Sequence, residues 1–248
     1  VGTDMESSKG ACNLALSKSA PGLEVYAAVG IHPGDGKSDV EKFGIDKCME
    51  KLRKIIKTSE KVVGVGEAGL DYFAATENSE SKRKATSEDE KEYQKELFKA
   101  QIKLADELDL PLVVHCRNAW DEIFDIISTK EKFSTGSNST KLRGVFHSFT
   151  GGVEEAKKAV ELGFCVSFSG ILTFKNAKNV QEAAKIVPDE RIMVETDSPY
   201  LAPEPLRGQI NVPANVRIIA NFLSSLRNTS PEAIYVQTSA NAQKLFNL

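Results

Sequence analysis

Short apolar runs alternate with amphipathic helical patterns along this chain, and this alternation constrains the fold more than any other feature. Continuous apolar runs are typical of strands buried on both faces, and helices between them are typical of parallel sheets. We therefore predict an α/β fold whose parallel sheet is either covered on both faces or closed into a barrel. The predicted strands cover 25–31, 62–67, 112–115, 144–147, 164–169 and 191–195, and the predicted helices cover 46–58, 92–108, 119–127, 153–162, 177–186, 212–226 and 231–246.

A histidine or an acid stands at the end, or just past the end, of five of these runs. A residue in this place projects from the carboxyl edge of a buried strand, and neighbouring parallel strands bring such residues to one point. The pattern therefore predicts a metal or catalytic site at that edge. The residues concerned are His32, Glu67, His115, His147 and Asp197.

The bulk composition fits one large enzyme domain. The 248 residues are 41% hydrophobic and 27% charged, which is enough to bury a substantial core, and α/β barrels commonly have this length. We predict a single domain over residues 1–248. The formal net charge of −3 gives no overall cationic field, so a nucleic acid or another polyanion would have to be bound locally.

The cysteines and the apolar segments favour an intracellular protein. The four cysteines are scattered without a C-x-x-C pair, which is typical of reduced thiols in a reducing compartment. No stretch approaches the roughly 18 consecutive apolar residues that cross a bilayer, and the first residues have no signal-peptide pattern. We expect a location in the cytoplasm or the nucleus, with no membrane partner and no obligate protein partner.

The residue types at the strand ends favour a divalent metal ion. His115 and His147 supply neutral imidazoles, and Glu67 and Asp197 supply carboxylate oxygens, a mixture that suits Zn²⁺ or Mn²⁺ better than a thiolate site would. Glu67 has two oxygens with which to bridge two ions, and Asp197 is placed to accept a proton from an attacking water. A single histidine at a strand end is more often a hydrogen-bonded structural residue, so the prediction rests on the whole set.

Four further polar residues lie near this predicted site. His32, which precedes Pro33, is a turn residue, a substrate contact or an outer-shell group. Arg117 lies on the same side of its strand as His115, where it either clasps a phosphate or forms a surface ion pair. Glu195 lies deeper in its strand than Asp197, and we predict that it hydrogen-bonds its neighbours. For Asp71, which follows Gly-Leu, a turn-forming role is the expectation.

Two polar segments read as surface loops. Residues 74–92, which include Lys82-Arg83-Lys84, follow the strand of Glu67, so this loop either contacts the substrate or is only a solvated surface segment. Residues 133–141 are rich in Ser and Thr and predict a neutral insertion.

Taken in order, several short motifs resemble the signature of the TatD-related metal-dependent deoxyribonucleases, and the resemblance spans nearly the whole chain. It implies a TIM-like barrel of the amidohydrolase type, a divalent-metal centre and hydrolysis of DNA phosphodiester bonds. It also implies that Glu67 and Asp197 are metal ligands and that His115 and His147 complete the site. The motifs are Gly30-Ile31-His32-Pro33, Gly66-Glu67-Ala68-Gly69-Leu70-Asp71-Tyr72, Val114-His115-Cys116-Arg117, His147-Ser148-Phe149-Thr150-Gly151 and Glu195-Thr196-Asp197-Ser198-Pro199-Tyr200-Leu201.

The chain departs from this family pattern in two places. The family has an earlier strand with a His-x-His pair or an Asn-containing equivalent, and residues 1–4 resemble the end of its second strand. The first strand and most of the second strand of the barrel are therefore expected to be absent from this chain. Because a barrel without them would expose unpaired edges, we expect a truncated chain rather than a native six-strand protein. Near the other end, Val212 replaces the acid that is usual between Asn211 and Pro213.

The expected function is a metal-dependent deoxyribonuclease, acting as an exonuclease on DNA with two divalent ions, Mg²⁺, Mn²⁺ or Zn²⁺, at its site. Asp197 and Glu67 are its predicted catalytic residues. One alternative is a metallohydrolase of the same fold that cleaves an amide, a lactone or another ester, because a fold does not fix the substrate. A second alternative is a catalytically inactive binding module that lacks the first strand.

Overall fold

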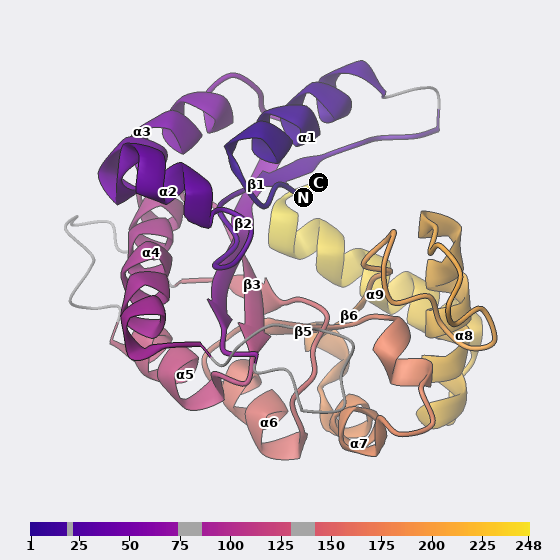
Figure 1. Cartoon of the computed structure of the whole chain (residues 1–248). Coiled ribbons are helices and arrows are strands. Elements are labelled where there is room, and N and C mark those ends of the chain that lie inside the picture. The colour runs from indigo at the N-terminus through magenta and orange to yellow at the C-terminus, as the bar shows by residue number, and fades with distance from the viewer. Residues whose placement is uncertain (19–21, 74–85, 130–141) are drawn as a thin grey trace. The chain divides into compact units, whose positions relative to one another are not determined.

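The computed structural model describes residues 1–18, 22–73, 86–129 and 142–248, and these fall into two compact units, Val1–Arg143 and Gly144–Leu248. Helices and parallel strands alternate in each unit (Figure 1). The α/β class with parallel strands that the sequence predicts is therefore confirmed.

The first unit has three parallel strands, with β2 in the middle. Parallel neighbours cannot be joined by a tight turn, and helices accordingly lie between them along the chain. The strands are β1 (Ala27–Val29), β2 (Val62–Asp71) and β3 (Leu112–Arg117), and the helices are α1 (Met5–Ser17), α2 (Lys37–Phe43), α3 (Ile45–Ile56), α4 (Glu88–Glu107) and α5 (Trp120–Ser128).

Strand β2 is longer than its apolar run predicts, and it continues past Glu67 to Asp71. Gly69 makes this possible, because a Cβ at this position would overlap the carbonyl oxygen of His115 on β3 and because its φ is +153°. The two strands approach each other closely here, and Asp71 pairs in register with Arg117. Asp71 is the last residue of β2, and its Oδ1 accepts the Phe73 N–H at 2.9 Å, so it has the expected turn-forming contact just past the strand.

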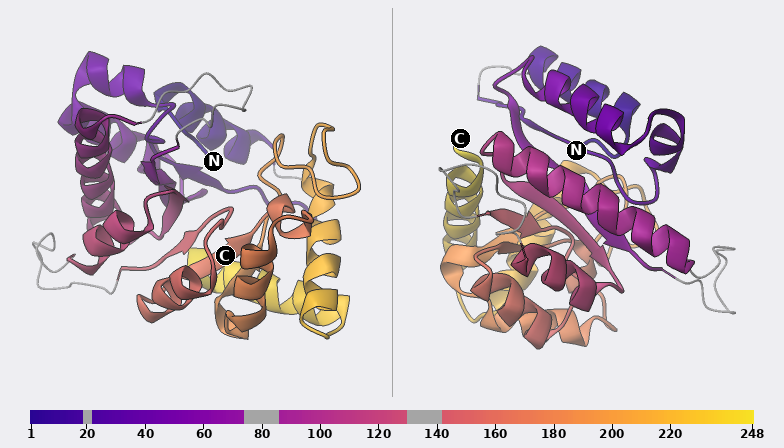
Figure 2. Two further views of the ribbon diagram at one scale, coloured as in Figure 1. Left: turned by 60° about the horizontal axis from the view of Figure 1, so that its bottom comes forward. Right: turned by 90° about the vertical axis from the view of Figure 1, so that its left-hand side faces the viewer.

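Helix α4 packs against β2, and the right-hand view of Figure 2 shows it in front of the strands of the first unit. The helix begins with a capping box, in which Ser87 accepts the backbone N–H of Glu90 and the Glu90 carboxylate accepts that of Ser87. Leu97 and Phe98 lie on its buried face with two glutamines, Gln94 and Gln101. Burial of an amide side chain requires hydrogen-bond partners, and both glutamines find them on the strands.

The second unit repeats the same construction with three more parallel strands, β5 lying between β4 and β6. Its core is rich in aromatic residues, and the rings of Phe146 and Phe164 lie 5.4 Å apart between centroids. The strands are β4 (Gly144–Phe146), β5 (Cys165–Phe168) and β6 (Ile192–Val194). The helices are α6 (Val153–Glu161), η2 (Gly170–Thr173), α7 (Lys178–Ile186), η3 (Asp189–Arg191), η4 (Pro213–Asn215), α8 (Val216–Leu226) and α9 (Pro231–Phe246).

Two helices, α1 and α2, are absent from the sequence-based prediction. The buried face of α1 carries Met5, Ser8, Cys12 and Ala15, and side chains this small give only a weak apolar stripe. Residues 1–4 were expected to end a strand, but they belong to no strand element. Their backbone nevertheless bonds to the sheet region, since the Gly2 N–H donates to Ala28 O and the Gly2 carbonyl accepts the Glu67 N–H, both at 2.9 Å.

Candidate metal centre

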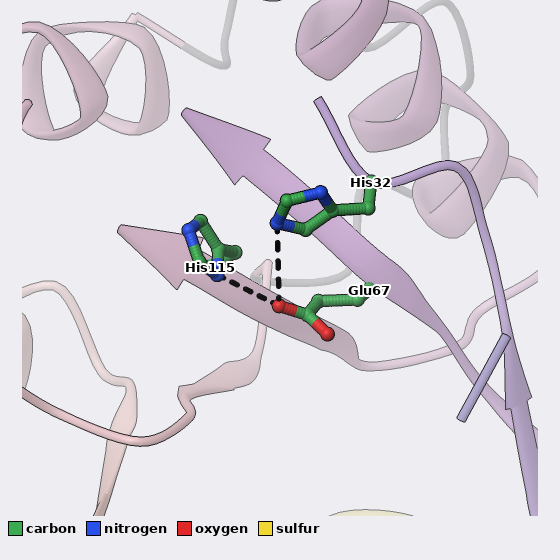
Figure 3. Close-up of side chains that lie close together, drawn as sticks. All are labelled: His32, Glu67 and His115. Atoms are coloured by element: carbon green, nitrogen blue, oxygen red, sulfur yellow. Dashed lines mark hydrogen bonds and ion pairs between the residues drawn. The ribbon is translucent and has the colours of Figure 1, made fainter. Parts of the chain in front are cut away.

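Three predicted residues converge in the first unit: His32 after β1, Glu67 on β2 and His115 on β3 (Figure 3). His115 Nδ1 lies 2.7 Å from Glu67 Oε1, and His32 Nε2 lies 3.7 Å from the same oxygen. One potential ligand atom of each residue lies within 4.8 Å of the others. Parallel pairing of neighbouring strands is what brings together residues that are 48 positions apart in the sequence.

Asp71 is a site residue that the sequence reasoning missed. Its Oδ2 lies 3.6 Å from His115 Nε2, on the side of the ring opposite Glu67, and the side chain is only 6% exposed. Burial raises the pKa of Asp71, but the contacts with His115, the N–H of Phe73 and the charge of Arg117 outweigh it, so the pKa is lowered. A signal was present, because Glu67 and Asp71 are four residues apart on one strand.

Two buried glutamines of α4 hold the backbone near this group. Gln101 accepts the Ile31 N–H and donates to the Ile31 carbonyl, both at 2.9 Å, immediately before His32. Gln94 makes the same two-bond clamp with the backbone of Asp71, at 2.8 and 3.1 Å. Gln94 and Gln101 are seven positions apart and therefore lie on one face of α4. Through them the helix fixes the backbone of Ile31 and of Asp71.

His32 lies in the turn that follows β1 and is buried. Its Nδ1 accepts the backbone N–H of Gly34 at 3.1 Å and that of Asp35 at 3.3 Å. Burial and the neighbouring His115 lower the pKa of His32 to about 4, against the opposing effect of Glu67, so the ring is neutral at neutral pH. The predicted turn contact is present, and the ring also meets the His115 ring edge-on at 4.4 Å between centroids.

The second unit brings together His147, Glu195 and Asp197. Glu195 Oε1 lies 3.0 Å from His147 Nδ1 and accepts the Ser148 N–H at 2.9 Å. Asp197 has a φ of +57°, a strained conformation for a residue with a side chain, and its carbonyl accepts the Tyr200 N–H at 2.9 Å. The amide of Asn211, which is buried, donates to Thr196 O and Tyr200 O and so fixes the loop on both sides of Asp197.

Both groups have the donor chemistry that a divalent metal ion requires. An ionised Glu195 only accepts hydrogen bonds, so His147 Nδ1 carries the proton and its Nε2 keeps a lone pair for a metal. His115 has a carboxylate beside both ring nitrogens, with Glu67 Oε1 at 2.7 Å from Nδ1 and Asp71 Oδ2 at 3.6 Å from Nε2. Imidazole nitrogens oriented by carboxylates, together with carboxylate oxygens, fit Zn²⁺ or Mn²⁺.

Arg117 ends β3, and its guanidinium lies over the ring of Phe73, 3.7 Å from the centroid. This stacking holds a cation at the edge where β2 and β3 end. The Lys82-Arg83-Lys84 run and residues 133–141 lie outside the residues that the structure describes. Among the described helices, none is long and apolar enough to cross a membrane.

Comparison with known proteins identifies the family. The family model described as TatD related DNase matches residues 1–247. The chain belongs to this family. A Buchnera aphidicola subsp. Baizongia pistaciae protein described as an uncharacterized metal-dependent hydrolase is 40% identical over 227 residues, which cover 90% of this chain and 75% of that protein. The uncharacterized metal-dependent hydrolase YabD of Bacillus subtilis is 36% identical, with 90% of this chain and 78% of YabD covered. The chain is thus a member of a metal-dependent hydrolase family.

Solved structures of the TatD family share this fold. The crystal structure of YJJV, a TatD homologue from Escherichia coli, has a TM-score of 0.81 and 27% sequence identity, and the match covers 100% of this chain and 85% of YJJV. A TatD family hydrolase from Entamoeba histolytica has a TM-score of 0.76 at 21% identity, over 99% of this chain and 82% of its own, which is a likeness of fold.

Proposed function

We propose that the protein hydrolyses DNA phosphodiester bonds as an exonuclease and uses two divalent metal ions, Mg²⁺, Mn²⁺ or Zn²⁺. The observation that carries the proposal is the pair of histidine–carboxylate groups, in which His115 lies beside Glu67 and Asp71 and in which Glu195 orients the imidazole of His147. Membership of the TatD-related DNase family supports the choice of DNA as the substrate.

In this proposal Glu67 and His115 of the first group, and His147 and Asp197 of the second, are the metal ligands. When bound, divalent ions supply Lewis-acid polarisation of a phosphoryl oxygen and make water more acidic. Glu67 would offer its two carboxylate oxygens to the metal of the first group. A carboxylate oxygen of Asp197 accepts the proton of the attacking water, and its fixed loop keeps that oxygen in place.

Arg117 is proposed to bind the phosphate backbone. Its guanidinium lies over the Phe73 ring, and Arg117 is an exposed residue at the end of β3, two residues beyond His115. A planar guanidinium offers two parallel N–H donors to a phosphate, which a lysine cannot do. Arg117 thus supplies a local positive charge for phosphate binding in a chain whose net charge is −3.

The test is a nuclease assay on end-labelled single-stranded and duplex DNA with Mg²⁺, Mn²⁺ or Zn²⁺, and with EDTA. The wild type should release nucleotides from an end in a metal-dependent manner. Asp197→Asn should lower kcat/KM by at least about 100-fold, because the residue loses its charge as ligand and proton acceptor. The matched control is Asp125→Asn, which changes an exposed acid of α5 and should leave activity unchanged.

Three results would contradict the proposal. A wild type that is inactive on DNA but cleaves simple esters, lactones or amides would support a different metallohydrolase. Metal binding without activity on any of these substrates would support the binding module. Full activity of Asp197→Asn would exclude the role given to that residue. The intracellular location and the absence of an obligate protein partner stay predictions.

A further inference from the structure

The hydrogen bonds of His32 determine which of its ring nitrogens carries the proton. The backbone N–H groups of Gly34 and Asp35 both point to Nδ1, at 3.1 and 3.3 Å. A backbone amide can only donate, so Nδ1 must present its lone pair and cannot carry a hydrogen. A neutral imidazole has one ring N–H, and in His32 it is therefore on Nε2.

His147 has the opposite arrangement, and the contrast separates two roles. Its Nδ1–H donates to Glu195, so Nε2 is the nitrogen with the lone pair. A metal ligand needs that lone pair directed at the ion. His32 directs an N–H at Glu67, and it could bind an ion through Nε2 only as an imidazolate anion.

The Nε2–H of His32 points toward Glu67 from a largely buried side chain. The His32 side chain is 9% exposed, and Glu67 Oε1 lies 3.7 Å from Nε2, beyond hydrogen-bond range. Figure 3 shows this nitrogen facing the Glu67 oxygen that also contacts His115. This N–H is therefore a donor that an oxygen of a ligand beside Glu67 can accept.

We propose that His32 is not a metal ligand but a phosphate-binding hydrogen-bond donor, whose Nε2–H contacts a non-bridging oxygen of the scissile phosphate beside Glu67. The proposal rests on the proposed function for the identity of the substrate, a phosphodiester. The assignment of the proton to Nε2, and the exclusion of His32 from the ligands, rest on the turn geometry alone.

The decisive variant is His32→Asn. The Asn Oδ1 can take the place of Nδ1 as acceptor for the turn, whereas the donor at the position of Nε2 is removed. His115→Asn, on the neighbouring strand, is the matched control. We expect His32→Asn to keep the wild-type number of Zn²⁺ or Mn²⁺ ions, measured by elemental analysis and calorimetry, with a dissociation constant within about threefold of wild type. His115→Asn should lose an ion or weaken its binding by at least about 10-fold.

The phosphate contact is measured separately on the metal-loaded protein. His32→Asn should bind inorganic phosphate about 10-fold more weakly and should lose about 10- to 100-fold in kcat/KM on DNA. His32→Gln, which places an amide donor near the position of Nε2, should recover part of that loss. Loss of metal in His32→Asn at the level of His115→Asn, or unchanged phosphate binding and activity, would overturn the proposal.

Nitrogen-15 NMR of the histidine rings keeps this inference distinguishable from the proposed function. We expect His32 to show the neutral tautomer with the proton on Nε2 both without metal and with Zn²⁺. A shift of the His32 Nε2 signal to that of a metal-bound nitrogen would contradict the inference even in an active nuclease. If the protein does not cleave DNA, the proposed function fails while the tautomer and the metal count still test His32.

Discussion

At the scale of single residues, the hydrogen-bond partners of an imidazole set its role. His147 has the carboxylate of Glu195 at Nδ1, whereas the Nδ1 of His32 receives backbone N–H groups. An anionic partner places the proton on its own side and directs the lone pair away from itself, and a backbone donor does the reverse. The same side chain thus becomes a ligand in one place and a donor in another.

The orienting role of Glu195 can be tested by mutation. Glu195→Ala removes the acceptor of His147 Nδ1 and of the Ser148 N–H, so the ring loses its fixed orientation. We expect metal affinity to fall about 10- to 100-fold, measured by competition with a chelator. Glu195→Gln, whose Oε1 can still accept, should recover part of this loss, and Glu182→Gln on the exposed face of α7 should have no effect. Unchanged affinity in Glu195→Ala would show that His147 needs no orienting partner.

Tyr93 gives a pH prediction that does not depend on metal. Its hydroxyl is buried without a hydrogen-bond partner among the described residues, and burial together with the negative charges of Cys48, Glu41 and Asp39 raises its pKa to about 12. A raised folded-state pKa contributes stability that is complete below pH 10 and is lost as the pH rises through 12.

The variant Tyr93→Phe should therefore be more stable than wild type by about 1 kcal/mol at pH 8, because it removes an unsatisfied polar group. The difference should widen between pH 10 and 12, where the wild type is penalised and phenylalanine does not ionise. Urea unfolding at pH 8 and pH 11 measures both effects, with the exposed Tyr200→Phe as the control. An equal loss of stability above pH 10 in both proteins would disprove the pH dependence.

At the scale of elements, α4 aligns the first group by clamping the backbone rather than by touching the ligands. Gln94 and Gln101 each satisfy both the N–H and the carbonyl of one residue at the end of a strand. An amide is the only side chain that offers one donor and one acceptor in this fixed geometry without a charge. Packing of α4 on β2 therefore sets the position of the strand ends from which His32 and Asp71 project.

The clamp predicts the effect of Gln101→Leu. The change preserves volume but leaves the N–H and the carbonyl of Ile31 buried without partners, at a cost of about 1–3 kcal/mol for each. We expect the free energy of unfolding, measured with urea, to fall by about 2–4 kcal/mol. The turn at His32 should also be less stable, and the activity should be lower. Gln101→Glu keeps only the acceptor, so its stability should lie between that of the wild type and that of Gln101→Leu. A Gln101→Leu variant as stable as the wild type would contradict the stabilising role of these two hydrogen bonds.

At the scale of the whole molecule, the two compact units each contain one of the histidine–carboxylate groups. Metal binding to the folded chain should therefore stabilise both units. We expect Zn²⁺ or Mn²⁺ at 100 times its dissociation constant to add about 2.7 kcal/mol per site, seen as a higher Tm that EDTA abolishes. Two double variants, Glu67→Gln/His115→Asn and His147→Asn/Asp197→Asn, should each lose part of the increase. A double variant that keeps all of it would show that its group binds no ion.

The local residue pattern predicts some of the observed elements and misses others. Strong apolar runs predict all six strands of the described residues, because a buried strand requires apolar residue types along its run. The extension of β2 to Asp71 is not predicted, since it depends on the close approach of β3 at Gly69. Helix α1 is missed because its buried face is made of small side chains, which give a weak pattern.

The sequence by itself determined the order of strands and helices, the histidines and acids that follow the strands, and the family to which the chain belongs. These are properties of residue types and their spacing. Only the tertiary structure decided which nitrogen of His147 has a lone pair and which carboxylates meet the ring of His115, because these partners come from other elements. Glu195 is 48 residues from His147, and Asp71 reaches the ring of His115 only across the β2–β3 pair. The residue types of the site can thus be predicted from the sequence, whereas the ring nitrogen that carries the proton in His32 and in His147 cannot.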